Sequence, residues 1–169
     1  MYKDGVGGRQ QILRLYRPTQ YFGYRAYFAG EPYVSSVAAV EASEVGMIHM
    51  DIVKDFINEN VKLAWFFIHE LSHNLGGSDT KIVNLTQKHI RGRLAESLSL
   101  LIDNYGFEED GETLKIYMAR EDIANLSNMT TSNAIRTLSA FVSEKIITVD
   151  GRRIKIINEP ALRKISKFG

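Results

Sequence analysis

The chain has 169 residues, a formal net charge of +1 at pH 7 and no cysteine. The lack of cysteine excludes disulfides, thiolate zinc sites and cysteine catalysis. No apolar run is long enough to span a bilayer, and the polar, glycine-rich start differs from a signal peptide. We therefore expect a cytoplasmic protein that makes no membrane contact.

The two parts of the chain carry opposite charge. Residues 1–112 contain 11 Lys and Arg against 15 Asp and Glu, a net charge of −4. Residues 113–169 contain 10 against 5, a net charge of +5. A positive field is what a phosphate-binding module requires, so the asymmetry favours a nucleic-acid contact in the C-terminal part.

Residues 1–50 are expected to be β-rich. Short runs at 11–16, 33–37 and 45–48 are separated by Gly, Pro and Asp at hairpin spacing. We interpret the aromatic side chains of this stretch as the core and rim of a small barrel. So short a stretch makes a poor closed β domain, and we expect that an upstream part of the sheet is missing.

A short helix is predicted from Asp51, followed by a long helix over 61–85. Small and apolar side chains recur along the long helix at alternating steps of four and three, the spacing of a coiled-coil seam. We expect the seam to pair with the same helix of a second copy; packing within the chain is the alternative. Gly76 and Gly77 each cost about 1 kcal/mol relative to alanine and mark a point where the helix could bend. The seam residues are Ala64, Ile68, Leu71, Leu75, Ser78, Ile82 and Leu85.

The same helix contains His69-Glu70-Leu71-Ser72-His73, which matches the HExxH signature of zinc proteases. A match with three specified positions arises often by chance, and zinc needs a third ligand. Glu96, 23 residues beyond His73, lies in a predicted helix with no substrate-binding strand nearby. We interpret the two histidines as surface residues and assign no metal site and no catalytic residue. A zinc hydrolase that uses His69, Glu70 and His73 is the alternative function.

A further helix is predicted over 86–103, then an acidic turn at 108–112 and a strand over 114–118. Residues 119–138 predict two short helices joined by a tight turn. Asn128 tolerates the left-handed conformation of such a turn, and Thr130 is a plausible N-cap for the second helix. Three residues of that helix, at i, i+4 and i+7, are predicted to be buried: Ala134, Leu138 and Phe141.

The outward face of the second helix offers hydroxyls and an arginine, the groups that read bases in the major groove. An ordinary helical hairpin is the alternative for this stretch alone. Beyond it, Asp150-Gly151 separates two β-branched runs, a strong signal for a hairpin, and basic residues including Lys155 follow the tip. Strand, helix, turn, helix and basic hairpin make a winged helix-turn-helix. The residues predicted to contact DNA are Arg120, Thr130, Thr131, Ser132, Asn133, Ile135, Arg136, Ser139, Arg152 and Arg153.

This order of parts resembles the Crp/Fnr family of bacterial transcription regulators, the relatives of the cyclic-AMP receptor protein. The resemblance covers nearly the whole chain and includes the run from Ile90 to Ala95 that opens the DNA-binding part. It implies an α+β fold in three parts. These are the C-terminal part of a cyclic-nucleotide-type β-roll that acts as a sensor (1–60), a dimerisation helix (61–85) and a winged helix-turn-helix DNA-binding domain (86–169). Since members have a longer β-roll, we expect the chain to be short at its N-terminus.

The chain departs from the cyclic-AMP-binding members at the phosphate. Those members place Glu directly after the motif glycine and an Arg-Ser pair before the next strand, where this chain has Tyr24 and Tyr33-Val34. Without that arginine the charge-assisted bonds to a cyclic phosphate are lost, so the effector is unknown and is not expected to be cyclic AMP. The expected effector pocket consists of Tyr24, Arg25, Tyr33, Val34, Ser78 and Asp79.

The second helix departs from the family pattern too. Arg136 occupies the position of the family's arginine, but Thr131 and Ser132 replace the charged pair ahead of it. We predict a guanine contact by Arg136, worth about 1–3 kcal/mol of discrimination, within an unusual half-site.

The resemblance implies a sequence-specific regulator rather than an enzyme. It would bind an inverted-repeat operator in double-stranded DNA as a homodimer, with RNA polymerase and a small-molecule effector as further partners. No cofactor is assigned. A short relative that forms heterodimers with full-length partners is a third reading.

Overall fold

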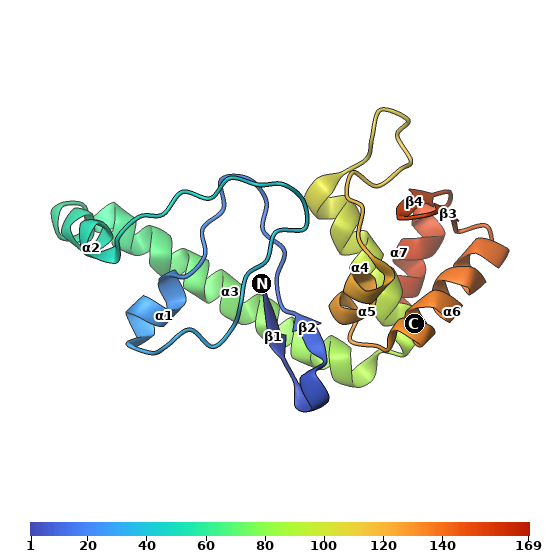
Figure 1. The fold of residues 1–169 in the computed structure, drawn as a ribbon, viewed down its shortest axis with the longest axis horizontal. Coiled ribbons are helices and arrows are strands. Elements are labelled where there is room, and N and C mark those ends of the chain that lie inside the picture. The colour runs from blue at the N-terminus through green and yellow to red at the C-terminus, as the bar shows by residue number, and fades with distance from the viewer.

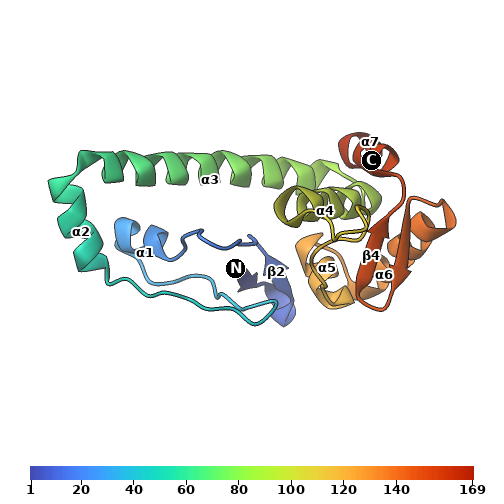
Figure 2. The ribbon, with the colours of Figure 1, turned by 90° about the horizontal axis from the view of Figure 1, so that it is seen from above.

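The computed structural model describes residues 1–169 and shows an elongated α+β chain. One long helix, α3 (Val61–Gln87), runs along its length, and a compact head of residues 90–169 lies at one end (Figure 1). The N-terminal segments form a second layer alongside α3, which extends from α2 (Met50–Glu59) to the head (Figure 2). None of the helices combines the length and apolar character needed to cross a membrane.

The N-terminal layer contains little regular structure. Strands β1 (Tyr2–Asp4) and β2 (Gln10–Ile12) form an antiparallel hairpin, whose turn includes the 3-10 helix η1 (Val6–Gly8). The short helix α1 (Tyr24–Ala29) begins after Gly23, at φ 95, and ends at Gly30, at φ 64. Both glycines take left-handed conformations that a side chain would strain.

The prediction of β structure over residues 1–50 is correct for the hairpin and wrong for the rest. The run 11–16 is a strand only to Ile12, the run 33–37 makes a single bridge from Ser36 to Tyr2, and 45–48 forms no strand. Side chains of the runs 33–37 and 45–48 are mostly exposed, including Met47 at 96%, whereas those of 11–16 are half-buried. A strand needs a neighbour for its backbone hydrogen bonds, and beyond the β1–β2 hairpin and the bridge from Ser36 to Tyr2 these runs form no ladder.

Helices α2 and α3 confirm the predicted short and long helices. The side chain of Asn60 caps α3 by accepting a hydrogen bond from the backbone N–H of Lys62, at 3.1 Å. The helix continues without interruption through Gly76 and Gly77, so the predicted weak point is not a bend in this structure. No residue of α3 is buried. The helix therefore relies on partial contacts along one side and leaves the other side open.

The head contains the hydrophobic core of the molecule. Its elements are α4 (Ile90–Tyr105), α5 (Arg120–Leu126), α6 (Thr131–Ser143), β3 (Ile147–Asp150), β4 (Arg153–Ile156) and α7 (Glu159–Phe168). The 20 buried residues of the core cluster all lie between Leu94 and Leu162. The head thus has a core of its own, whereas only Tyr24 and Ala26 are buried in the N-terminal layer.

Two features of the head differ from the sequence prediction. Helix α7, which packs against α4, was not predicted; Asn158 caps it by accepting from the N–H of Ala161 at 3.0 Å. The predicted strand over 114–118 is an extended segment with few ladder bonds, such as Leu114 N–H to the carbonyl of Ile154 at 2.9 Å. Its alternate residues Leu114, Ile116 and Met118 are buried, so the predicted alternation is confirmed.

Candidate nucleic-acid interface

Helix α6 packs one face into the head and presents the other to solvent. Ala134, Leu138 and Phe141 are buried, as predicted. Arg136 donates from Nη2 to Oδ1 of Asn133 at 2.5 Å, one turn earlier on the helix. The guanidinium therefore lies toward the N-terminal half of α6, where the hydroxyl groups are. The exposed residues of this face are Thr131, Ser132, Ile135, Arg136 and Ser139.

The turn before α6 is held as predicted. Asn128 has φ 50, in the left-handed region. The side chain of Thr130 accepts a hydrogen bond from the backbone N–H of Asn133 at 3.2 Å and so caps the helix. Beside it, the Ser127 and Ser97 hydroxyls share a buried hydrogen bond of 2.8 Å that ties the turn to α4. The start of α6 is therefore fixed by both local and tertiary contacts.

The hairpin of β3 and β4 lies next to the start of α5. Arg120, the first residue of α5, donates to the carbonyl of Gly151 at the hairpin tip. Arg152 and Arg153 are exposed, and the Arg153 guanidinium lies 5.6 Å from the Tyr117 ring centroid. These contacts place the three arginines around the tip.

Two details of the hairpin differ from the prediction. Its reversal is at Gly151-Arg152, one residue later than predicted, because Asp150 pairs with Arg153. Lys155 forms ion pairs with Glu112 at 2.8 Å and Asp110 at 3.7 Å. Its charge is therefore engaged within the head rather than offered to a phosphate.

An ion pair that the sequence did not reveal fixes the far end of α6. The Arg91 guanidinium donates two hydrogen bonds to the Glu144 carboxylate, with Nη1 to Oε1 at 2.7 Å. The same guanidinium lies 4.8 Å from the Phe141 ring centroid. The hydrogen bonds from Arg91 lower the pKa of Glu144. Helix α6 is thereby held at its first and its last turn.

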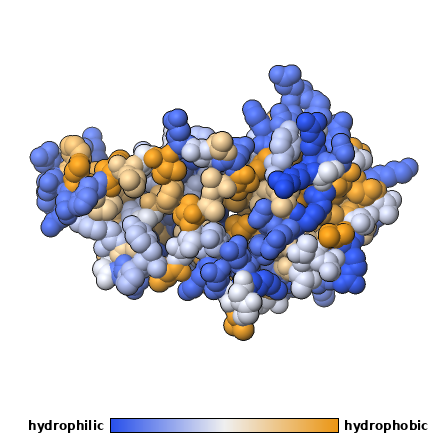
Figure 3. Space-filling model, viewed as in Figure 1, coloured by the Kyte–Doolittle hydropathy of each residue, from blue (hydrophilic) through white to orange (hydrophobic).

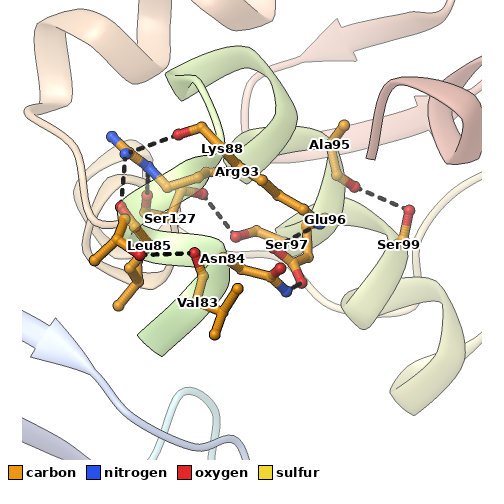
Figure 4. Close-up of polar contacts among 11 residues, drawn as sticks. Val83, Asn84, Leu85, Lys88, Arg93, Ala95, Glu96, Ser97, Ser99 and Ser127 are labelled. Carbon is orange, nitrogen blue, oxygen red and sulfur yellow. Dashed lines mark hydrogen bonds and ion pairs between the residues drawn. The ribbon is translucent and has the colours of Figure 1, made fainter. Parts of the chain in front are cut away.

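Arg93 joins the long helix to the head. Its guanidinium donates to the carbonyls of Leu85 at 3.4 Å and Lys88 at 3.3 Å, at the end of α3 (Figure 4). It also donates to the carbonyls of Ser127 at 3.2 Å and Asn128 at 3.3 Å, in the turn before α6. One side chain thus bridges the end of α3 and the helix-turn-helix.

The N-terminal hairpin also contacts the head directly. Gln11 donates from Nε2 to the carbonyl of Asn125 in α5 at 2.8 Å, and Arg9 donates to the side chain of Asn128. Ile12 and Leu15 pack against the core cluster of the head. Figure 2 shows β2 beside α5. The N-terminal layer therefore reaches the helix-turn-helix by a second route, independent of α3.

A cavity of about 630 Å³ lies between the N-terminal layer, α3 and the head. Of the six residues expected to form an effector pocket, Tyr24 and Ser78 line it. The remaining four, Arg25, Tyr33, Val34 and Asp79, do not. Arg25 instead pairs with Glu31 at 2.9 Å on the surface, and it lies on helix α1, within the stretch that was expected to be β-rich.

The side chains of the two HExxH histidines are exposed, and His73 also borders the cavity. The rings of His69 and His73 are stacked with centroids 6.3 Å apart, and the side chain of His69 is 79% exposed. No group of three His, Asp or Glu side chains is arranged to hold a metal ion. The zinc hydrolase alternative therefore finds no support.

Comparison with known families assigns both ends of the chain. Residues 92–165 match the Crp-like helix-turn-helix domain, and residues 1–60 match the cyclic nucleotide-binding domain. The chain is 27% identical over 162 residues to the fumarate and nitrate reduction regulatory protein of Vibrio cholerae, covering 94% of this chain and 64% of that protein. It is 21% identical to a CRP-like cAMP-activated global transcriptional regulator of Mycobacterium tuberculosis, covering 93% of this chain and 70% of that protein. The chain thus spans less than two thirds of the Vibrio protein.

Solved structures show the same fold. A CRP/FNR-family transcriptional regulator from Thermus thermophilus has a TM-score of 0.74 at 19% identity, covering 98% of this chain and 81% of that one. FixK2 from Bradyrhizobium japonicum has a TM-score of 0.73 at 19% identity, covering 97% and 80%. The predicted α+β fold, with a cyclic-nucleotide-binding part, a long helix and a winged helix-turn-helix, is confirmed, although the strands of the first part are limited to the β1–β2 hairpin.

Proposed function

Since the chain belongs to the Crp/Fnr family of transcription regulators, we propose that it binds double-stranded DNA sequence-specifically and regulates transcription. The observation that carries this proposal is the exposed face of α6, where Thr131, Ser132 and Arg136 surround a well-anchored first turn. A helix of this kind enters the major groove with its N-terminal residues against base edges. Arg120, Arg152 and Arg153 beside it would contact phosphates. The predicted DNA residues thus divide into base-reading and backbone-positioning groups.

We propose that the protein acts as a homodimer paired through α3. The seam residues Ile68, Leu75 and Ile82, each seven positions apart, are 49%, 65% and 61% exposed in the single chain. The alternate seam residues Ala64, Leu71, Ser78 and Leu85 are partly buried against the chain itself. The view of Figure 3 looks onto the N-terminal layer, where apolar residues are scattered among polar ones. One row of the seam therefore supports pairing between copies, and the other supports packing within the chain.

The three parts proposed from the sequence, 1–60, 61–85 and 86–169, would then act as sensor, dimerisation helix and DNA-binding domain. Arg93 and the contact between Gln11 and Asn125 offer two physical routes from sensor to head. We place the protein in the cytoplasm, with RNA polymerase as a further partner. If no ligand of the sensor alters DNA affinity, the relay is absent and the protein is a constitutive binder.

Selection of bound sequences from random double-stranded DNA tests the proposed function. We expect an enriched inverted repeat with half-sites one helical turn apart, roughly 34 Å. Sedimentation of the bound complex should give two copies of the chain per duplex. Recovery of unenriched sequences at low salt, with binding lost at moderate salt, would mean that only charge attracts the DNA and would refute sequence-specific recognition.

A further inference from the structure

Two exposed histidines of α3 have no role in the fold or in the proposed DNA contact. His69 and His73 stand four residues apart, about one turn of the helix, so their side chains leave the same face. Their rings are nearly parallel, with an interplanar angle of 2° and centroids 6.3 Å apart. The only acidic group within 4 Å of either ring is Glu70, whose Oε1 lies 3.8 Å from Nδ1 of His69. Both imidazoles are therefore open to a ligand from solvent.

The spacing of the two imidazoles allows both to bind one metal ion. Bonds from imidazole nitrogen to the metal are about 2.0–2.1 Å long, so the two coordinating nitrogens have to lie within about 4 Å of each other. The Cβ atoms of helical residues four apart are about 5–6 Å apart, which lets two such rings converge. Rotation of the exposed side chains into other staggered rotamers brings the nitrogens together. The backbone needs no adjustment, because α3 is continuous through both residues.

The Glu70 carboxylate is placed to support one of the two rings. It lies on the Nδ1 side of His69. A metal-binding histidine commonly donates its other ring N–H to a carboxylate, which fixes the tautomer and makes the coordinating nitrogen more basic. A proton on Nδ1 of His69 would face Glu70 and leave Nε2 free for the ion. Glu70 would thus orient a ligand, unlike the glutamate of an HExxH protease, which acts as the general base.

The donor atoms select the class of ion. Imidazole nitrogens suit Cu²⁺, Ni²⁺ and Zn²⁺, whereas Mg²⁺ and Ca²⁺ take oxygen ligands. Among the divalent first-row ions, Cu²⁺ binds a given set of nitrogen ligands most tightly. Two protein ligands leave the remaining coordination positions to water. The pair is therefore a binding site, and it differs from a catalytic zinc site, which needs the third protein ligand that this chain does not place nearby.

We propose that His69 and His73 form a chelating site for a divalent transition-metal ion, which binds Cu²⁺ most tightly and in which Glu70 orients the ring of His69. Both histidines lie outside the a and d positions of the α3 seam, so the site stays open if two copies pair along it. An ion that binds the helical conformation better than the unfolded chain stabilises that conformation by mass action. The site depends on α3 alone and is independent of DNA binding.

Titration of Cu²⁺ alone into the full chain, free of any affinity tag, tests the proposal. Calorimetry gives the dissociation constant and the stoichiometry, and electron paramagnetic resonance counts the nitrogens bound to the ion. The variants are His69→Gln, His73→Gln and Glu70→Gln. The matched controls are His49→Gln and His89→Gln, which make the same replacement at the two other histidines of the chain, both exposed. Circular dichroism confirms that each variant is folded.

We expect one Cu²⁺ per chain, with two imidazole nitrogens bound to it. Loss of a group that only orients a ligand typically costs about 10–100-fold in metal affinity, so loss of a ligand itself in His69→Gln or His73→Gln should cost about tenfold or more. Each of these variants should also retain a single bound imidazole. Glu70→Gln should weaken binding less than either and keep both nitrogens, and the two control variants should match the original chain.

A second measurement uses Zn²⁺, which should raise the thermal midpoint of the original chain and leave that of His73→Gln unchanged. Three results would overturn the proposal: no saturable binding of Cu²⁺, fewer than two imidazole nitrogens on the ion, or equal losses in the control variants. The last of these would place the ion on scattered surface histidines. If a variant fails to fold, the nitrogen count on the original chain decides, because His69 and His73 are the only histidines one turn apart.

Discussion

The seam of α3 makes a quantitative prediction about assembly. Leu75 is 65% exposed in the single chain, lies at the middle of the seam and touches little within its own protomer. Replacing it with alanine removes apolar surface that only a second copy could bury. The variant Leu75→Ala should therefore leave the folded monomer intact and weaken the dimer.

The magnitude follows from the exposed fraction. Full burial of a leucine side chain is worth about 1.5–3 kcal/mol, so the exposed part of Leu75 contributes about 1–2 kcal/mol per copy. A two-fold dimer contains the residue twice, which gives about 2–4 kcal/mol per dimer. The dimer dissociation constant should rise by about 30- to 1,000-fold.

Sedimentation equilibrium over a range of concentrations measures this constant. The matched control is Val83→Ala, which removes an apolar side chain 48% exposed on the same helix but outside the seam. It should leave the constant within a few fold of the original. If Val83→Ala and Leu75→Ala have equal effects, or neither has any, the copies do not pair along this seam and the reasoning fails.

Three further predictions concern the head, each measured by the free energy of unfolding. Thr130→Ala removes the cap of α6 and should lower the free energy of unfolding, measured by urea denaturation, by about 1 kcal/mol. No change would show that the cap hydrogen bond contributes nothing to stability. Gly92→Ala puts a Cβ into the backbone of Gly169 and should cost about 1–3 kcal/mol, an expectation that an unchanged thermal midpoint would contradict. Hydrogen bonds from the Thr113 hydroxyl and nearby backbone N–H groups lower the pKa of Asp110, so its contribution is present above the unfolded value near 3.9 and is lost as pH falls below it. Asp110→Asn should therefore lose less free energy of unfolding than the original chain as the pH falls from about 5 to about 2. Equal losses in the two proteins over this range would refute this role of Asp110.

The features of α6 were predictable because they are local. The period of Ala134, Leu138 and Phe141, the cap at Thr130 and the left-handed Asn128 all depend on residues within a few positions. Helix α7 carried comparable signals and was missed. Asn158 precedes Pro160 at the first turn, and Leu162 begins its buried face, so the start could have been recognised.

The N-terminal layer could not be predicted in the same way. A β-branched or aromatic run indicates a strand only if a partner strand accepts its hydrogen bonds, and no local pattern reports that partner. The contacts from Gln11 to Asn125 and from Arg14 to Ser78 join residues far apart in the chain, so spacing could not reveal them. Helix α1 could not be predicted for the same reason, and on it Arg25 pairs with Glu31 and does not line the cavity.

Base recognition by Arg136 is the central claim, and a series of single-base variants of the selected operator tests it most directly. Arg136→Ala should relax preference at one guanine position by about 1–3 kcal/mol and leave the others unchanged. The control Arg152→Ala, at the hairpin tip, should weaken binding to all sequences by a similar factor and lower the salt dependence. If Arg136→Ala keeps the original base preference at every position, Arg136 reads no base. That result would contradict the assignment of α6 as a recognition helix that reads DNA through this arginine.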